Sequence, residues 1–239
     1  MRGLFGEFIG TFILVFVGCG SVAWTILIQE LSLWQIATIW GAGVCLAIIL
    51  SSPFSKAHLN PAVTIGFWLS ADFKRKDILP YFTGQFLGAF MAALSLYLIF
   101  NSHIDTPTLS TAKFFGEYYT ESASFDMWAA TGVEAIGTFL LMFGIYMIIK
   151  IEVKRAKFIH PLLIGVLLSV LIFFLAPYTQ AGFNPARDFM PRVFSYFAGW
   201  DMAFATNGIG WLIVYILGPI VGAGAAAVLY RMIVERRVD

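Results

Sequence analysis

The sequence predicts an all-α membrane protein with six transmembrane helices and two re-entrant half-helices in an inverted repeat. Three observations predict this fold class: an apolar composition, six hydrophobic runs of spanning length, and two short motifs that each occur twice. Of the 239 residues, 59% are hydrophobic and 12% are charged, and the mean hydropathy is +0.83. Soluble domains carry about 25% charged residues, so we place this chain in a lipid bilayer.

The same composition argues against several classes of function. A net charge of +1 gives no basis for binding nucleic acid. Cys19 and Cys45 both lie in apolar runs and are interpreted as small buried residues, not as a disulfide or a metal pair. The three histidines are scattered, and no Cys, His and carboxylate cluster has metal-ligand spacing. We therefore expect no metal, no cofactor and no enzyme activity.

Six apolar runs are long enough to cross the bilayer core, which takes about 20 helical residues. They fall at roughly 4–28, 33–53, 78–100, 128–150, 159–178 and 210–233. The first run is too long for the apolar region of a signal peptide, so we interpret it as a true span. Segments 61–71 and 185–198 are also apolar but too short to span. The 11 residues of 61–71 reach only about 16 Å as a helix, in a core about 30 Å thick.

Lysine and arginine residues set the orientation, because cytoplasmic loops collect them. With the N-terminus inside, twelve of the fifteen lie on the cytoplasmic side, including Arg236 and Arg237. We therefore predict that both termini are cytoplasmic and that segment 101–127 is an external loop over the outer face, to which we assign no chemistry. The three cations left outside are Lys113, Arg187 and Arg192.

The chain repeats two motifs in the same order at nearly the same separation. Glu7 and Glu134, 127 residues apart, are each followed after one residue by Ile-Gly-Thr-Phe, and Asn-Pro-Ala begins at Asn60 and again, 124 residues later, at Asn184. Each half of this single domain, roughly 1–100 and 128–239, holds three spans and one short segment. Because three is odd, the second half enters the membrane from the opposite side, and the two half-helices are expected to meet near the midplane.

The chemistry of Asn-Pro-Ala suits a helix start inside a pore. Asparagine is a strong N-cap and proline fits the first helical position, while the amide NH₂ is expected to remain a free donor toward the lumen. Two facing helix starts, each with about half a positive charge, disfavour cations and protons but allow neutral hydroxylated molecules to pass. The six motif residues are Asn60, Pro61, Ala62, Asn184, Pro185 and Ala186.

Glu7 and Glu134 lie inside spans, where an ionisable side chain is functional by default. In a proton-coupled secondary transporter they would act as relays. In a passive channel each would accept hydrogen bonds from unpaired backbone N–H groups beside a half-helix. Their matched positions in the repeat favour the bracing role, and flux under an imposed proton gradient discriminates between the two classes.

Together these motifs resemble the aquaporin, or major intrinsic protein, family. The similarity rests on Glu7 and Glu134 with their IGTF sequences, on SKAHLNPAVT (55–64) and on GFNPARDFMPR (182–192), and it covers all six spans and both half-helices. It implies the family fold, a right-handed bundle with one pore per protomer, and a homotetramer. We expect the chain to reside in the plasma membrane. Asp188, Arg192 and IWGAGVCLAI (39–48) are similar to the glycerol-facilitator branch.

The resemblance also implies which side chains form the pore constriction: Trp40, Ile172, Ala181 and Arg187. Trp40 would offer an apolar face to the carbon backbone of a solute, while Arg187 would bond its hydroxyls and repel cations. The best-known glycerol facilitators have a bulky aromatic at the position of Ala181 and glycine at that of Ile172, so this set looks closer to plant nodulin-type channels. We expect a broad, apolar aperture for glycerol and water, with undissociated lactic acid and urea as alternative solutes.

Four residues are expected to support the loops: Glu7, His58, Glu134 and Asp188. By resemblance, His58 fixes the inner loop and offers a carbonyl to the lumen. Asp188 is expected to pair with a nearby positive group or to cap the half-helix instead of touching solute. His103 and His160 lie at span ends and are assigned no role.

Overall fold

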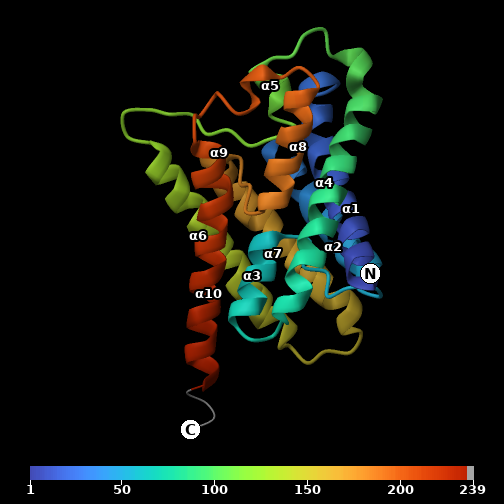
Figure 1. Ribbon diagram of the computed structural model, residues 1–239, viewed down its shortest axis with the longest axis vertical. Coiled ribbons are helices and arrows are strands. Elements are labelled where there is room, and N and C mark those ends of the chain that lie inside the picture. Colours follow the sequence, from blue (N-terminus) through green and yellow to red (C-terminus); the bar gives the residue numbers. More distant parts are fainter. Residues whose placement is uncertain (236–239) are drawn as a thin grey trace.

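The structure, a computed structural model, describes residues 1–235 as a bundle of helices (Figure 1). Within these residues, six helical stretches are long and apolar enough to cross a membrane. They are α1 (Arg2–Leu27), α2 (Leu33–Ser51), α4 (Ile78–Phe100), α6 (Met127–Ile149), α7 (Ala156–Thr179) and a sixth stretch formed by α9 (Gly210–Leu212), η4 (Ile213–Leu217) and α10 (Gly218–Glu235). Arg236 and Arg237, which were counted for the orientation, lie outside the described residues.

Two short helices, α3 (Pro61–Leu69) and α8 (Pro185–Phe197), occupy opposite halves of the bundle. In Figure 1, α3 lies in the lower half and α8 in the upper half, with their N-terminal ends toward the middle. They correspond to the two apolar segments that were too short to span. Their starts therefore meet deep within the bundle, where the functional site is built.

Local capping explains why both half-helices begin at asparagine. The Oδ1 atom of Asn60 accepts a hydrogen bond from the backbone N–H of Ala62 at 2.8 Å. Asn184 Oδ1 accepts from the N–H groups of Ala186 at 3.0 Å and Arg187 at 3.3 Å. A proline follows each asparagine at the first helical position, where no N–H is needed and φ is already suitable.

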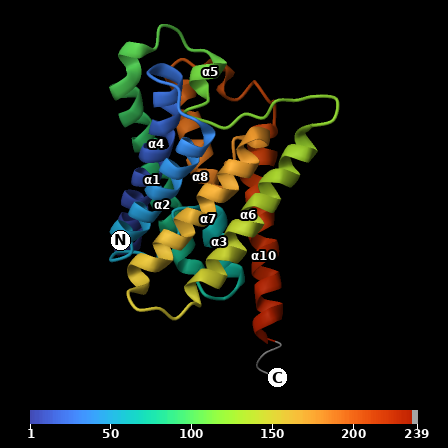
Figure 2. The ribbon, with the colours of Figure 1, turned by 180° about the vertical axis from the view of Figure 1, so that it is seen from behind.

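Besides α3 and α8, the segments that connect the spans contain an isolated bridge between Ser122 and Phe125. They also contain four short helical turns among the described residues: η1 (Arg75–Asp77), η2 (Asn101–His103), α5 (Leu109–Ala112) and η3 (Asp201–Ala203). Segment 101–127 folds over one end of the bundle, where α5 lies (Figure 2). The start of α1 and the end of α10 lie at the opposite end in both views. An even number of crossings returns the chain to the side from which it began.

The sixth span departs from regular α geometry at η4, a π-helical turn that the sequence analysis did not anticipate. Pro219 follows this turn closely and lacks the N–H that would bond the carbonyl of Tyr215 four residues earlier. Its ring also crowds that carbonyl, and a local widening of the helix relieves both problems. Tyr215, within the π turn, is fully buried beside the site.

Close helix crossings hold the bundle together without large side chains between the backbones. Helix α1 packs against α4, and α6 packs against α10. At Gly84 and Gly88 of α4, an added Cβ would collide with backbone carbonyls of α1, and at Gly222 of α10 it would collide with the carbonyl of Ala135 on α6. Small residues permit this approach in membrane helices, so the two halves use the same kind of contact.

Candidate functional site

The two segments that lead into the half-helices share an unusual backbone. Ala57 and Leu59 have φ values of 53° and 56°, and Ala181 and Phe183 have values of 61° and 51°. These are the first and third residues before each asparagine, so the conformation repeats with the sequence motif. A left-handed backbone at a residue other than glycine costs about 1–3 kcal/mol and persists only where its surroundings hold it.

On the α3 side the holding group is Glu7, whose side chain is fully buried. Its Oε1 accepts the N–H of His58 at 3.0 Å, and its Oε2 accepts the N–H of Leu59 at 2.7 Å. The side chains of Ser55 and Gln85 donate to the same carboxylate at 2.7 and 2.8 Å. Both carboxylate oxygens are therefore occupied by the non-helical segment and its neighbour.

Glu134 occupies the position equivalent to Glu7 on the α8 side, and its side chain is also fully buried. It accepts the backbone N–H groups of Gly182 at 3.0 Å and Phe183 at 2.7 Å. The hydroxyl of Thr179 donates to it at 2.6 Å. The two carboxylates thus satisfy equivalent backbone groups in the two repeats.

The amide groups of Asn60 and Asn184 join the two segments to each other. Asn60 Nδ2 donates to the carbonyl of Phe183 at 2.8 Å, and Asn184 Nδ2 donates to the carbonyl of Leu59 at 2.8 Å. We expected both NH₂ groups to be free toward the lumen, and this is wrong for one hydrogen of each. The left-handed residues before the asparagines supply the carbonyls that accept these bonds, leaving the second hydrogen of each amide as a donor.

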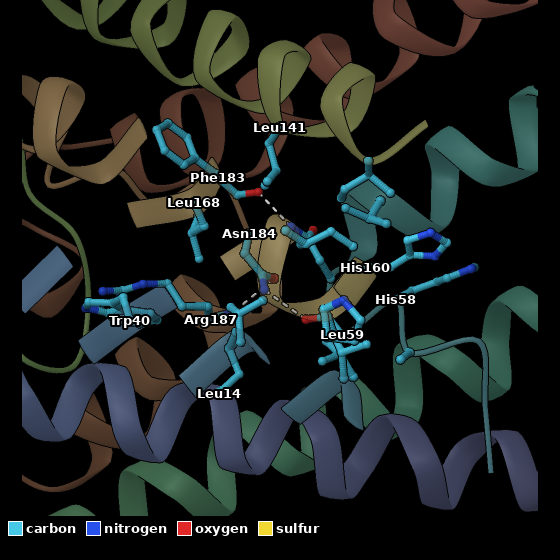
Figure 3. Close-up of a pocket in the computed structure, with 18 of the residues that line it drawn as sticks. Leu14, Trp40, His58, Leu59, Leu141, His160, Leu168, Phe183, Asn184 and Arg187 are labelled. Carbon is cyan, nitrogen blue, oxygen red and sulfur yellow. Dashed lines mark hydrogen bonds between the residues drawn. The ribbon is translucent and has the colours of Figure 1, made fainter. Parts of the chain in front are cut away.

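A cavity of about 180 Å³ runs past these asparagines. All four residues expected at the constriction line it: Trp40 from α2, Ile172 from α7, Ala181 before α8, and Arg187 in the first turn of α8. Trp40 and Arg187 lie side by side at one end of it (Figure 3). The Arg187 Cζ atom is 4.5 Å from the centre of the indole ring, so a cation–π contact makes them one corner of the wall.

His58 and Asp188, expected to support the loops, have several partners. His58 Nδ1 is 3.2 Å from the hydroxyl of Thr64, and its ring stacks on Phe67 with centres 4.7 Å apart. Asp188 does not line the cavity and pairs with Arg192, its Oδ1 lying 2.8 Å from Nη2. His58 contributes to the cavity wall, and Asp188 stands behind it.

Two residues at the site were missed. The loop 101–127 was assigned no chemistry, yet its Glu117 is fully buried and forms an ion pair with Arg187. His160, which was assigned no role, lines the far end of the cavity, with its Nε2 2.9 Å from the carbonyl of Ile151. The position of His160 at a span end was a usable signal. Nothing in the local pattern around Glu117 marked it.

The sequence of this chain is similar to known proteins over most of its length. The family described as "Major intrinsic protein" matches residues 1–230. A glycerol uptake facilitator protein of Haemophilus influenzae is 40% identical, over 95% of this chain and 91% of that protein. A propanediol uptake facilitator of Salmonella typhimurium is 36% identical over 97% and 93%, and a glycerol uptake facilitator protein of Escherichia coli is 36% identical over 97% and 88%.

A solved structure is also similar over almost the whole length. The X-ray structure of the aquaglyceroporin from Plasmodium falciparum superimposes with a TM-score of 0.85 at 27% sequence identity, covering 98% of this chain and 96% of that one. This similarity, together with the six apolar helices of the described residues, confirms the predicted fold class.

Proposed function

Because the chain belongs to the major intrinsic protein family and is a passive membrane channel for small neutral solutes, we propose that its cargo is glycerol and similar small polyols, with water also conducted. Relatives are named as uptake facilitators for glycerol and for propanediol, which supports this choice. Membership of a family of channels also confirms that the chain is not an enzyme.

One observation carries the proposal: a single cavity is lined by an apolar aromatic face, a guanidinium and the two asparagines. We propose that solute passes along this cavity in single file and that Trp40, Ile172, Ala181 and Arg187 form the constriction that selects it. The indole suits the carbon side of a polyol, and the guanidinium suits its hydroxyls. The two half-helix starts and the Arg187 charge disfavour cations.

The buried carboxylates support a passive channel over a proton-coupled transporter. A relay carboxylate has to release and bind a proton at an accessible oxygen. Glu7 and Glu134 instead have both oxygens engaged by hydrogen-bond donors, and each accepts two backbone N–H groups that have no helical partner. Protonation would cost these bonds, which suits a permanent brace.

We further propose that the channel forms a homotetramer in the plasma membrane, with both termini cytoplasmic and with halves 1–100 and 128–239 related as an inverted repeat joined by an external loop. The start of α1 and the end of α10 lie at one end of the bundle, and the loop folds over the other. The distribution of lysine and arginine supports placing the former end inside.

Stopped-flow swelling of proteoliposomes tests the solute. Glycerol, propanediol, urea and lactic acid at low pH are each compared with water flux driven by sucrose. We expect rapid glycerol and propanediol entry. If only lactic acid or urea exceeds empty liposomes, the alternative of a channel for those solutes replaces the polyol assignment.

A separate measurement tests the mechanism. Radiolabelled glycerol is supplied to proteoliposomes with an imposed proton gradient and no glycerol gradient. A passive channel leaves the internal and external concentrations equal. Accumulation above the external concentration that collapses with an uncoupler would establish a coupled transporter instead.

A further inference from the structure

The external loop is clamped to the start of α8 through backbone groups of Glu117. The N–H of Glu117 donates to Asp188 Oδ1 at 2.6 Å, and its carbonyl accepts from Arg192 Nη2. The next residue, Tyr118, donates its N–H to Gln180 Oε1 at 2.8 Å. The guanidinium of Arg192 also lies over the Tyr118 ring, with Cζ 4.4 Å from its centre. The position of this segment is therefore set from both sides of the second Asn-Pro-Ala motif.

This clamp delivers the Glu117 side chain to Arg187. The carboxylate contacts Arg187 Nη2 in an ion pair whose members are 0% and 5% exposed. Within the part of the chain that the structure describes, neither Glu117 oxygen has a further hydrogen-bond partner, and Arg187 Nη1 has none. The pair thus uses one end of the guanidinium, while Nη1 at the other end is buried without a hydrogen-bond partner among the described residues.

The two members of the pair differ in their relation to the cavity. Arg187 lines it beside Trp40 (Figure 3), whereas Glu117 is not among the residues that line it. Glu117 therefore stands behind the guanidinium, on the side away from solute. A buried guanidinium without a partner is strongly unfavourable, so the carboxylate decides where the guanidinium rests and how much charge it presents.

We propose that Glu117 is a specificity-determining positioning residue that holds Arg187 against the wall of the channel and so sets its preference between glycerol and water. It neutralises Arg187 and occupies Nη2, and the resting position of the guanidinium then sets the width of the passage beside Trp40. The inference rests on the proposed role of Arg187 at the constriction. Without Glu117, the guanidinium turns into the lumen, and glycerol is hindered more than water because it needs the wider passage.

The main test is Glu117→Gln in proteoliposomes at about pH 9, measured as the ratio of glycerol to water permeability. We expect the ratio to fall about fivefold, the factor for one hydrogen bond of ordinary strength. Glu121→Gln is the matched control, because Glu121 lies in the same loop and is exposed, and its ratio should equal that of the wild type. An unchanged ratio in Glu117→Gln overturns the proposal.

A double-mutant cycle separates positioning from a merely structural role. Arg187→Val alone should alter the ratio, and Glu117→Gln should add no further change in that background. An equal additional change would show that Glu117 acts through another group and would overturn the inference. If Arg187→Val keeps the wild-type ratio, the proposed constriction itself fails. If Arg187→Val changes it and Glu117→Gln does not, only the inference about Glu117 fails.

A second variant covers the case in which Glu117→Gln does not insert or fold. Glu117→Asp keeps the charge but withdraws it by one methylene, and it should lower the ratio in the same direction by a smaller factor. A wild-type ratio in folded Glu117→Asp would then overturn the proposal, since contact with Nη2 requires the full side-chain length.

Discussion

The orientation of Trp40 is decided by a residue on a neighbouring helix. Gly18 of α1 lies so close to the indole that an added Cβ would overlap the ring. The ring therefore packs against the backbone of α1, and the guanidinium Cζ of Arg187 lies 4.5 Å from the ring centre. In the proposed channel this corner is built from three elements, and the width of the passage also depends on Ile172 and Ala181, which line the same cavity.

Replacing Ala181 by phenylalanine should narrow this aperture. Ala181 lines the cavity and already has a left-handed φ of 61°, so the substitution adds bulk without asking for a new backbone class. We expect glycerol permeability to fall about tenfold relative to water, equivalent to about 1.4 kcal/mol of added barrier. Ala71→Phe is the control, since Ala71 has a φ of 65° and is exposed. An unchanged ratio for Ala181→Phe in swelling assays would contradict the constriction assignment.

The channel should also respond to pH through Glu117. Burial raises the pKa of Glu117 to about 8, against the opposing charge of Arg187. The carboxylate is therefore present above about pH 8 and is lost below it, so the ion pair weakens on acidification. We expect the glycerol-to-water ratio of the wild type to fall between about pH 9 and pH 6, approaching the value of Glu117→Gln.

Glu117→Gln is the control for the titration of other groups, because it removes only the Glu117 carboxylate and keeps the neighbouring titratable side chains. The charged and titratable groups that face Glu117 are Arg187, Asp188, Arg192, Glu134, Tyr118, Tyr215 and Cys19. If one of these is responsible, the ratio of Glu117→Gln will show the same pH dependence. A flat wild-type profile over this range would refute the prediction.

Helices of the two halves cross through equivalent glycine contacts, and these crossings position the braces. Glu7 is on α1 and Glu134 on α6, one helix from each crossing pair. Any change in the separation of α1 and α4 moves Glu7 relative to Gln85, which lies on α4 between Gly84 and Gly88 and donates to it at 2.8 Å. The geometry of the pore segments therefore depends on helix contacts outside the pore.

Gly88→Ala should weaken the crossing of α1 and α4. Its Cβ would collide with the backbone carbonyl of Phe8, which cannot move aside as a flexible side chain would. We expect a loss of about 1–3 kcal/mol, as for other overpacked contacts, read as a lower SDS midpoint for unfolding in mixed micelles. Gly132→Ala on α6 is the matched control, with nothing within 4 Å of the new Cβ. Equal midpoints for the two variants would rule out this account.

Across the whole molecule, the features that could be predicted from the sequence are those that depend on local residue chemistry or on the internal repeat. The caps at Asn60 and Asn184 follow from residue type, and the bracing hypothesis for Glu7 and Glu134 followed from their matched positions. The acceptors of the Asn60 and Asn184 side-chain amides could not be predicted from the sequence, because the distance between Asn60 and Phe183 is set only when the two halves pack. The ion pair of Glu117 and Arg187 could not be predicted for the same reason. Glu117 lies in a loop without periodicity, and Asp188 and Arg192 hold this loop in place only in the folded protein.

The reciprocal bonds of Asn60 and Asn184 join the two halves and should make them interdependent. Each Asn→Ala change removes a cap, worth about 1 kcal/mol, and a link to the other half, worth about 1 kcal/mol. Since both links join the same two segments, losing one loosens the other, and the double variant should lose less than the sum by at least about 0.5 kcal/mol. SDS unfolding midpoints of the singles and the double measure this coupling, with exposed Asn101→Ala as a control expected to match the wild type. Strict additivity would mean that the two half-helices are held separately, each by its own carboxylate.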